Sequence, residues 1–396
     1  MTKQFSKMLR SLPQWLTQQW STTAAAVDDD DHLAPLPAGL TQSLNQHIAS
    51  LPTPERYQKA LQLSVREAIQ AWQANPEVTS NCLVALSTPI EAIASHIKAS
   101  LEDYLLDCHV RFLLSGYHRS DDPIAITNHL QRELARATSP ENDHAAVPMT
   151  EAELHETIST IMVVPNLDEC FLRCIEGWEG IEHLQRLVSR DTARFWVFGS
   201  NDWAWIFLDK VCQVSAYLDQ TVALPELKGE DIATWLQPLF DLEIEQPDGT
   251  PLQLHITSEK ETYWETLTAL AKGNATTAAS LWLRTLRIDA KDLTPEGALP
   301  AEVHTINLVA AQPTLPHLMS LENLDRYLLH ELLVHGEMTQ AHLAYALGED
   351  ERVVRSRAQV LHREGIVIQR GRRLRVHPAH YPKIYRELGN NNFLIG

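Results

Sequence analysis

The stretch "IMVVPNLDECFLR", residues Ile161–Arg173, joins a short apolar strand to two adjacent carboxylates. An apolar run that ends in a polar turn is typical of a buried strand in a parallel sheet. Asp168 and Glu169 follow this run, at the place where a nucleotide-hydrolysing core holds a magnesium ligand and a base that activates water. That chemistry also needs a loop that binds phosphate, and such a loop should come earlier in the chain.

Apolar runs and helical segments alternate on both sides of this stretch. The predicted strands are "NCLVALS", "HVRFLLSG", "TIMVVPNLD" and "RFWVFGSN", and they are separated by helical segments such as "PIEAIASHIKASLEDYLLD" and "TEAELHETIS". Buried strands that alternate with helices predict a parallel sheet covered by helices on both faces. We therefore expect an α/β domain over residues 41–240.

The loop after the first of these strands should bind phosphate, but it lacks the residues for that task. A P-loop, GxxxxGK[ST], wraps phosphate with backbone N–H groups and neutralises it with a lysine. Here the loop reads "STPIEAIASHIK", with Ser87, Thr88, Pro89 and Glu91 at its start and no glycine. Pro89 has no N–H to donate, and Glu91 places a negative charge where a phosphate would sit. We expect a degenerate nucleotide-binding loop.

The rest of the chain divides into three further segments. Residues 1–40 are predicted to form an N-terminal helix followed by an acidic linker, "STTAAAVDDDDHLAPLPAG". Residues 241–318 are predicted to form a helical lid and a Pro-bearing connector, with one strand at "EVHTINLVAA". Residues 319–396 have the pattern of a winged helix, because three helical segments are followed by two short strands around Gly371.

The C-terminal part of the chain is basic, whereas the remainder is acidic. The chain carries a net charge of −18, yet residues 341–396 contain ten Lys and Arg against five Asp and Glu. Eight arginines lie on the third helix and the wing, which are the elements that touch duplex DNA in DNA-binding winged helices. They are Arg352, Arg355, Arg357, Arg363, Arg370, Arg372, Arg373 and Arg375. They can contact nucleic acid or pair with acidic groups of this chain or of a protein partner, and the sequence leaves both uses open.

Composition favours an ordinary globular protein of the cytoplasm. No window approaches 18 consecutive apolar residues, and the N-terminus lacks the apolar core and cleavage site of a signal peptide. The five cysteines have no zinc-type CxxC spacing, which indicates reduced thiols, and no metal site is predicted.

The order of these parts resembles the AAA+ superfamily, in particular STAND-like bacterial ATPases that carry a winged helix after the lid. "TIMVVPNLDECFLR" looks like the Walker B strand, with Asp168 at the magnesium position and Glu169 at the base position. "ARFWVFGSNDWAWIFLDKV" looks like the next strand, and Asn201 at its tip would be the sensor-one residue. "DQTVALPELKGEDIATWLQPLF" looks like the last strand and the start of the lid, and "GNATTAASLWL" like its closing helix. The resemblance implies a P-loop NTPase-like fold.

Two departures from the family pattern bear on function. The phosphate loop is degenerate, and the arginine expected after Gly273 and Asn274 is replaced by alanine and threonine. Phosphoryl transfer depends on positioning and charge neutralisation, so both losses argue against hydrolysis by this chain alone. Asp168, Glu169 and Asn201 are then vestigial, and no cofactor is expected.

The sequence therefore favours a non-catalytic regulatory or scaffolding subunit. It would bind a partner protein, such as an intact ATPase relative, with nucleic acid as a second ligand of the winged helix. One alternative is an ATP-binding ATPase that uses Asp168 and Glu169 with magnesium. Another is a DNA-binding transcriptional regulator.

Overall fold

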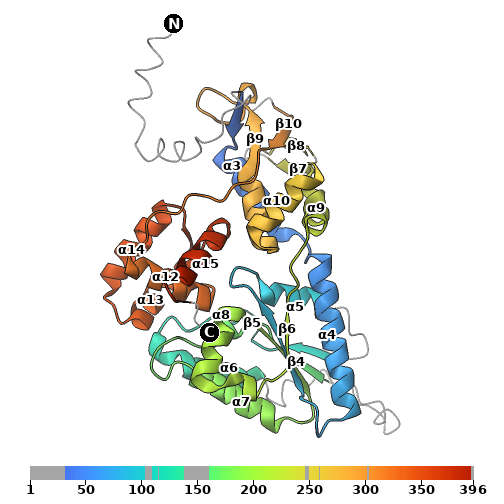
Figure 1. The fold of residues 1–396 in the computed structure, drawn as a ribbon, viewed down its shortest axis with the longest axis vertical. Helices are drawn as coiled ribbons and strands as arrows, with labels where there is room; N and C mark the ends of the chain where they lie inside the picture. The colour runs from blue at the N-terminus through green and yellow to red at the C-terminus, as the bar shows by residue number, and fades with distance from the viewer. Residues whose placement is uncertain are drawn as a thin grey trace.

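The computed structural model describes residues 32–102, 109–114, 116–137, 160–245, 249–257, 259–300 and 303–393. These residues form three bodies: an α/β domain, a lid and a winged helix (Figure 1). The helices predicted near residues 1–22 and 150–159 lie outside the described residues. No helix in the described ranges has both the length and the apolar character needed to cross a membrane.

The α/β domain is built on a five-stranded sheet in the order β3-β4-β5-β2-β6, and every strand pair in it is parallel. Its strands are β2 (Cys82–Ser87), β3 (His109–Phe112), β4 (Thr160–Val164), β5 (Phe195–Asn201) and β6 (Thr221–Ala223). All seven residues of β5 are buried, as expected for a strand covered on both faces. The predicted α/β fold is confirmed.

Helices cover both faces of this sheet because successive side chains of a strand point to opposite faces. The helices are α4 (Glu55–Ala74), α5 (Ile93–Leu101), α6 (Ile126–Ala137), α7 (Glu179–Arg190) and α8 (Asp202–Cys212). On β4, Ile161 and Val163 pack with α4 and α5, whereas Met162 and Val164 pack with α6 and α7. The sheet thus separates two apolar layers.

The lid contains a second sheet, which the sequence did not predict. Its helices are α3 (Ala38–Ser50), α9 (Gly229–Leu236), α10 (Glu261–Ala271) and α11 (Ala275–Thr285). Its strands are β1 (Leu33–Pro35), β7 (Asp241–Glu245), β8 (Pro251–Ile256), β9 (Leu286–Asp289) and β10 (Thr305–Ala310), in the order β1-β9-β10-β8-β7. The predicted strand at β10 is present, but the expectation of an otherwise helical lid is wrong. Part of the predicted linker, β1, pairs with β9 in this sheet.

The winged helix follows the predicted pattern and adds a C-terminal helix. Its elements are α12 (Asn323–His335), β11 (Met338–Thr339), α13 (Gln340–Leu347), α14 (Glu351–Arg363), β12 (Val367–Arg370), β13 (Arg373–Val376) and α15 (Tyr381–Asn390). Gly348 and Gly365 end α13 and α14 with positive φ angles of 65° and 70°, a conformation that glycine adopts without strain. Residues 311–322 form an irregular connector that links the lid to this domain.

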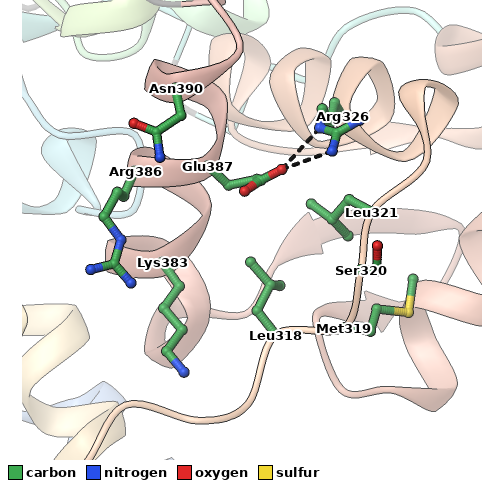
Figure 2. A pocket seen from close by; sticks show the side chains of 9 residues that line it. All are labelled: Leu318, Met319, Ser320, Leu321, Arg326, Lys383, Arg386, Glu387 and Asn390. Atoms are coloured by element: carbon green, nitrogen blue, oxygen red, sulfur yellow. Dashed lines mark hydrogen bonds and ion pairs between the residues drawn. The ribbon is translucent and has the colours of Figure 1, made fainter.

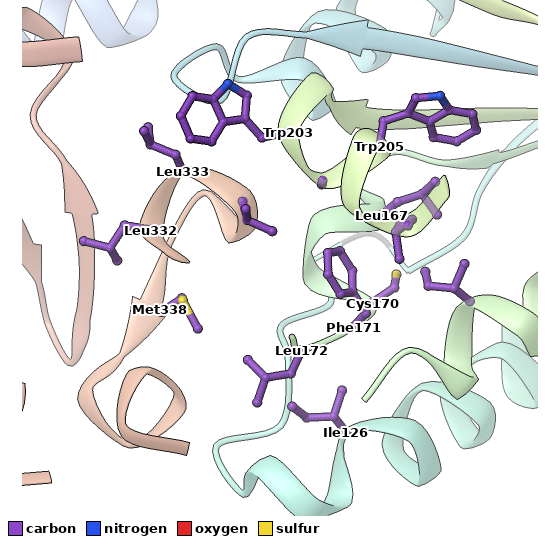
Figure 3. Packing of buried hydrophobic residues seen from close by; sticks show 14 of the residues in the cluster. Ile126, Leu167, Cys170, Phe171, Leu172, Trp203, Trp205, Leu332, Leu333 and Met338 are labelled. Carbon is purple, nitrogen blue, oxygen red and sulfur yellow. The ribbon is translucent and has the colours of Figure 1, made fainter. Parts of the chain in front are cut away.

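One hydrophobic core runs from the α/β domain into the winged helix. Phe171 and Trp203 of the α/β domain belong to the same buried cluster as Leu332, Leu333 and Met338. Figure 3 shows these side chains on the facing segments of the two domains. The lid has a separate core centred on residues such as Trp282 and Leu254. The winged helix is therefore packed against the α/β domain as part of its fold.

Candidate functional site

Asp168, Glu169 and Asn201 meet at the carboxyl ends of β4 and β5, as their place in the sequence predicts. The turn η4 (Leu167–Glu169) follows β4, and Asn201 ends the neighbouring strand β5. Asn201 Nδ2 donates to Asp168 Oδ2 at 2.8 Å. In open α/β sheets ligands bind beside the carboxyl ends of the strands, so these residues occupy the expected position for a site.

Asp168 is held by donors from β5. Its Oδ1 accepts hydrogen bonds from Ser200 Oγ at 2.8 Å and from the Asn201 backbone N–H at 3.1 Å. Burial raises the pKa of Asp168 to about 6, although these hydrogen bonds act in the opposite direction. Asn201 also caps α8 through Ala204 and donates to the carbonyl of Val334 in α12. The predicted sensor residue thus contacts the winged helix.

Glu169 is paired with groups of this chain rather than exposed to solvent. Its Oε1 accepts a hydrogen bond from Arg373 Nη1 on the wing at 2.8 Å, and its Oε2 accepts one from the backbone N–H of Arg119 at 2.9 Å. Only 7% of the Glu169 side chain is exposed. The carboxylate predicted to activate water therefore forms part of the joint between two domains.

Arg119 is the main residue of this site that the sequence did not reveal. Its side chain is buried and donates to the carbonyl oxygens of Phe171, at 2.7 Å, and of Asp168. Burial lowers its pKa, and the Glu169 carboxylate opposes that change. His335, buried at the end of α12, lies 3.3 Å from the Arg119 guanidinium. No motif surrounds Arg119, because its partners Phe171, Asp168 and His335 lie 52, 49 and 216 residues away in the sequence.

The loop after β2 directs its polar groups toward the lid. Glu91, predicted to repel phosphate, is buried against the first turn of α11. Thr88 Oγ1 accepts a hydrogen bond from Asn274 Nδ2 at 2.5 Å, and Ser87 Oγ donates to the carbonyl of Thr88 at 3.1 Å. Pro89 has no N–H to offer. The loop residues therefore bind one another and the lid.

The eight arginines of the winged helix divide into groups with different partners. Three pair with acidic side chains outside their own elements: Arg357 with Asp325 and Glu322, Arg372 with Asp121, and Arg373 with Glu169. Arg355 pairs with Glu351 one turn away on α14, and Arg375 is half-buried. Within the described ranges, the exposed side chains of Arg352, Arg363 and Arg370 have no hydrogen-bond or ion-pair partner.

A cavity of about 340 Å³ lies apart from these residues, between the connector and α15. Figure 2 shows that Leu318 and Leu321 line one side, and that Lys383 and Arg386 project from α15. Arg326 neutralises Glu387 there, with Nη2 and Oε1 2.9 Å apart. None of the residues predicted to form a functional site lines this cavity.

Comparison with known proteins gives matches only at the level of structure. No protein-family model matches the chain, and no curated protein sequence matches it. Cdc6p from Pyrobaculum aerophilum is 12% identical, with a TM-score of 0.36 over 87% of this chain and 96% of that one. The Aeropyrum pernix ORC1 protein in complex with DNA is 14% identical, with a TM-score of 0.35 over 89% and 98%. The Aeropyrum pernix ORC2 protein in its ADP form is 12% identical, with a TM-score of 0.34 over 92% and 96%.

These likenesses correct one prediction and leave another without support. The expectation of no cofactor is contradicted, because the similar ORC2 protein is described in an ADP form and in ADPNP–ADP complexes. That expectation rested on the sequence of the loop and on the missing arginine after Gly273 and Asn274. The degenerate, non-catalytic role gains no support from these proteins. The chain has the predicted α/β fold with a C-terminal winged helix.

Proposed function

We propose that this chain is an AAA+-like regulatory or scaffolding subunit that binds a partner protein. In this proposal, Asp168 and Glu169, in the turn after β4, hold the winged helix on the α/β domain. The observation that carries the proposal is the ion pair between Glu169 and Arg373, with Oε1 and Nη1 2.8 Å apart.

The contacts of Glu169 oppose a role in hydrolysis in this arrangement. A general base needs a free oxygen within hydrogen-bond reach of the water that it activates. Each oxygen of Glu169 already accepts a hydrogen bond, from Arg373 and from the backbone of Arg119. Asp168 is similarly occupied by Ser200 and Asn201. With its side chain only 7% exposed, Glu169 in this arrangement also has little contact with the solvent water that a general base must activate.

Purification from the native cell tests the proposal. The full chain should recover a partner protein in stoichiometric amount, and the wild type should hydrolyse ATP no faster than Glu169→Gln in the presence of magnesium. Recovery of the chain alone would count against a scaffold. ATP turnover that Glu169→Gln abolishes would show that the carboxylate is catalytic.

An ATP-binding ATPase is the second candidate, and one observation favours it. Asp168, Glu169 and Asn201 converge at the sheet edge in the arrangement that the resemblance implies for a magnesium ligand, a base and a sensor. Under this candidate, Mg-ATP should raise the melting temperature, since a ligand at about 100 times its Kd stabilises the folded state by about 2.7 kcal/mol. Asp168→Ala should abolish that rise. An absence of any shift in the wild type at millimolar Mg-ATP would reject this candidate.

A further inference from the structure

Glu91 makes a set of contacts that neither the winged-helix joint nor the predicted site explains. Its Oε1 accepts hydrogen bonds from the backbone N–H of Ala275 at 2.7 Å and from Tyr57 Oη at 3.0 Å. Its Oε2 accepts one from Thr276 Oγ1 at 2.6 Å and lies 3.4 Å from His96 Nε2. The donors come from α4, α5 and α11, and they surround a carboxylate whose side chain is only 2% exposed.

The N-terminus of α11 supplies part of this environment. The first backbone N–H groups of a helix have no partner within the helix, and the helix dipole favours an anion beside them. Asn274 caps α11 through the N–H of Thr277 at 2.7 Å, which leaves the N–H groups of Ala275 and Thr276 for Glu91. The carboxylate therefore binds where a helix of this kind binds an anion.

The hydrogen bonds keep Glu91 ionised in spite of its burial. Burial alone raises the pKa of a carboxyl group, but hydrogen bonds and charge from His96, together with hydrogen bonds from Thr276, bring the pKa of Glu91 below its ordinary value. A buried carboxylate without partners would be very unfavourable. The side chain thus acts as a bound anion.

The donors around Glu91 come from two bodies of the molecule. Glu91, Tyr57 and His96 lie in the α/β domain, whereas Ala275 and Thr276 begin a helix of the lid. We propose that the donors around Glu91 form an oxyanion site, and that Glu91 is its internal ligand, which holds the lid on the α/β domain. The class of external group that fits the same donors is a carboxylate or a phosphoryl group. The proposal is independent of the role of the winged helix.

Chemical rescue of Glu91→Ala tests this assignment in the full chain. The substitution should lower the melting temperature by about 5 °C, in line with the loss of a few kcal/mol in a protein of this size. Relative to the wild type in the same salt, sodium acetate or sodium phosphate should restore at least half of the loss. Sodium chloride at the same ionic strength should restore none. Restoration by acetate alone would identify a carboxylate site, and restoration by phosphate a site that also takes phosphoryl groups. Equal effects of all three salts would overturn the proposal.

A matched control and a second measurement keep the test decisive. Glu102→Ala removes a half-exposed carboxylate just after α5, whose pair with Lys98 spans 4.0 Å, and should change the melting temperature little. Glu91→Gln keeps the shape of the side chain and removes its charge, so it serves if Glu91→Ala does not fold. Hydrogen exchange at the amides of Ala275 and Thr276 should then be faster in Glu91→Gln than in the wild type. Unchanged exchange at these two amides would show that Glu91 does not hold the lid helix.

Discussion

Arg373 of the wing and Glu169 of the α/β domain form an ion pair, with Nη1 and Oε1 2.8 Å apart. Their side chains are 18% and 7% exposed, so water screens the pair only partly. The arginine predicted to contact nucleic acid and the carboxylate predicted to activate water therefore neutralise each other. The pair therefore joins the wing, on which nucleic-acid binding would depend, to the carboxylate on which ATP hydrolysis would depend.

Arg373→Ala should destabilise the folded chain by about 2–3 kcal/mol. Breaking a fully buried pair costs about 3–5 kcal/mol because one charge stays buried without its partner. The cost should be smaller here, since Arg373 is partly exposed and Arg119 still donates to Glu169. Denaturant unfolding measures the change. Arg352→Ala, on exposed α14, is the control and should change stability by no more than about 0.5 kcal/mol. A similar loss in both variants would contradict the importance of the pair.

Asp202→Asn should stabilise the protein more as the pH rises. Asp202 begins α8, its Oδ1 is buried without a hydrogen-bond partner among the described residues, and burial raises its pKa to about 7. The unfolded chain has the ordinary aspartate pKa of about 3.9, so ionisation weakens the folded state as the pH rises between these two values. The advantage of Asp202→Asn should be smallest near pH 4 and level off above about pH 7. Melting temperatures at several pH values measure this, and a gap independent of pH would contradict it.

Any duplex DNA binding by the winged helix should depend on the three arginines without partners in the described structure. Arg352, Arg363 and Arg370 are exposed, whereas Arg357, Arg372 and Arg373 already pair with acidic groups. Replacing the three exposed arginines with alanine should reduce the slope of log affinity against log salt concentration by about 3, because each phosphate contact contributes about one unit. Fluorescence anisotropy at several salt concentrations measures the slope.

Arg186→Ala provides the matched control for that experiment. Arg186 is a half-exposed arginine on α7, outside the winged helix, and pairs with Glu182 at 3.7 Å. It should leave the slope unchanged. An equal change in the control, or duplex binding that does not respond to salt, would reject a specific role for the three arginines.

Leu333→Ala should loosen the α/β domain as well as the winged helix. Leu333 is fully buried in the core that the two domains share, and truncation of such a leucine costs about 2–5 kcal/mol. Hydrogen exchange should therefore increase in β5 and α8 together with α12. Leu308 of β10 lies in the separate core of the lid. Leu308→Ala should therefore increase hydrogen exchange in the lid first. Exchange confined to the winged helix in Leu333→Ala would show that the core does not couple the domains.

The sequence predicts the α/β domain well because its signals are local. β4 and β5 are apolar runs buried on both faces, and polar residues mark the point where each run ends. Asp168, Glu169 and Asn201 come together because parallel strands place their carboxyl ends on one edge. The winged helix is also predicted from local signals, since three helical segments precede two short strands around Gly371 and Gly365 ends α14 with a positive φ.

The lid sheet and the partners of the carboxylates depend on distant residues. β8 alternates between exposed and buried positions, a period-two signal that the polar surroundings obscure. β1 has three residues, and its partner β9 lies some 250 residues further along the chain. The sequence presents Glu91 only as a repulsive charge, because the loop residues do not show that α11 supplies donors to it. The sequence does not reveal the role of Arg119 either, because its partners also lie far away along the chain.

The connector of residues 311–322 limits how far the winged helix can travel if its joint with the α/β domain opens. Twelve extended residues span at most about 40 Å. The wing would then stay within reach of Glu169. The length of the connector, rather than the protein concentration, would set the effective concentration of the wing at that site. Rebinding of the wing to the α/β domain is thus an intramolecular event. A competitor for Arg373 or Glu169 must therefore displace a partner that stays covalently linked to its site.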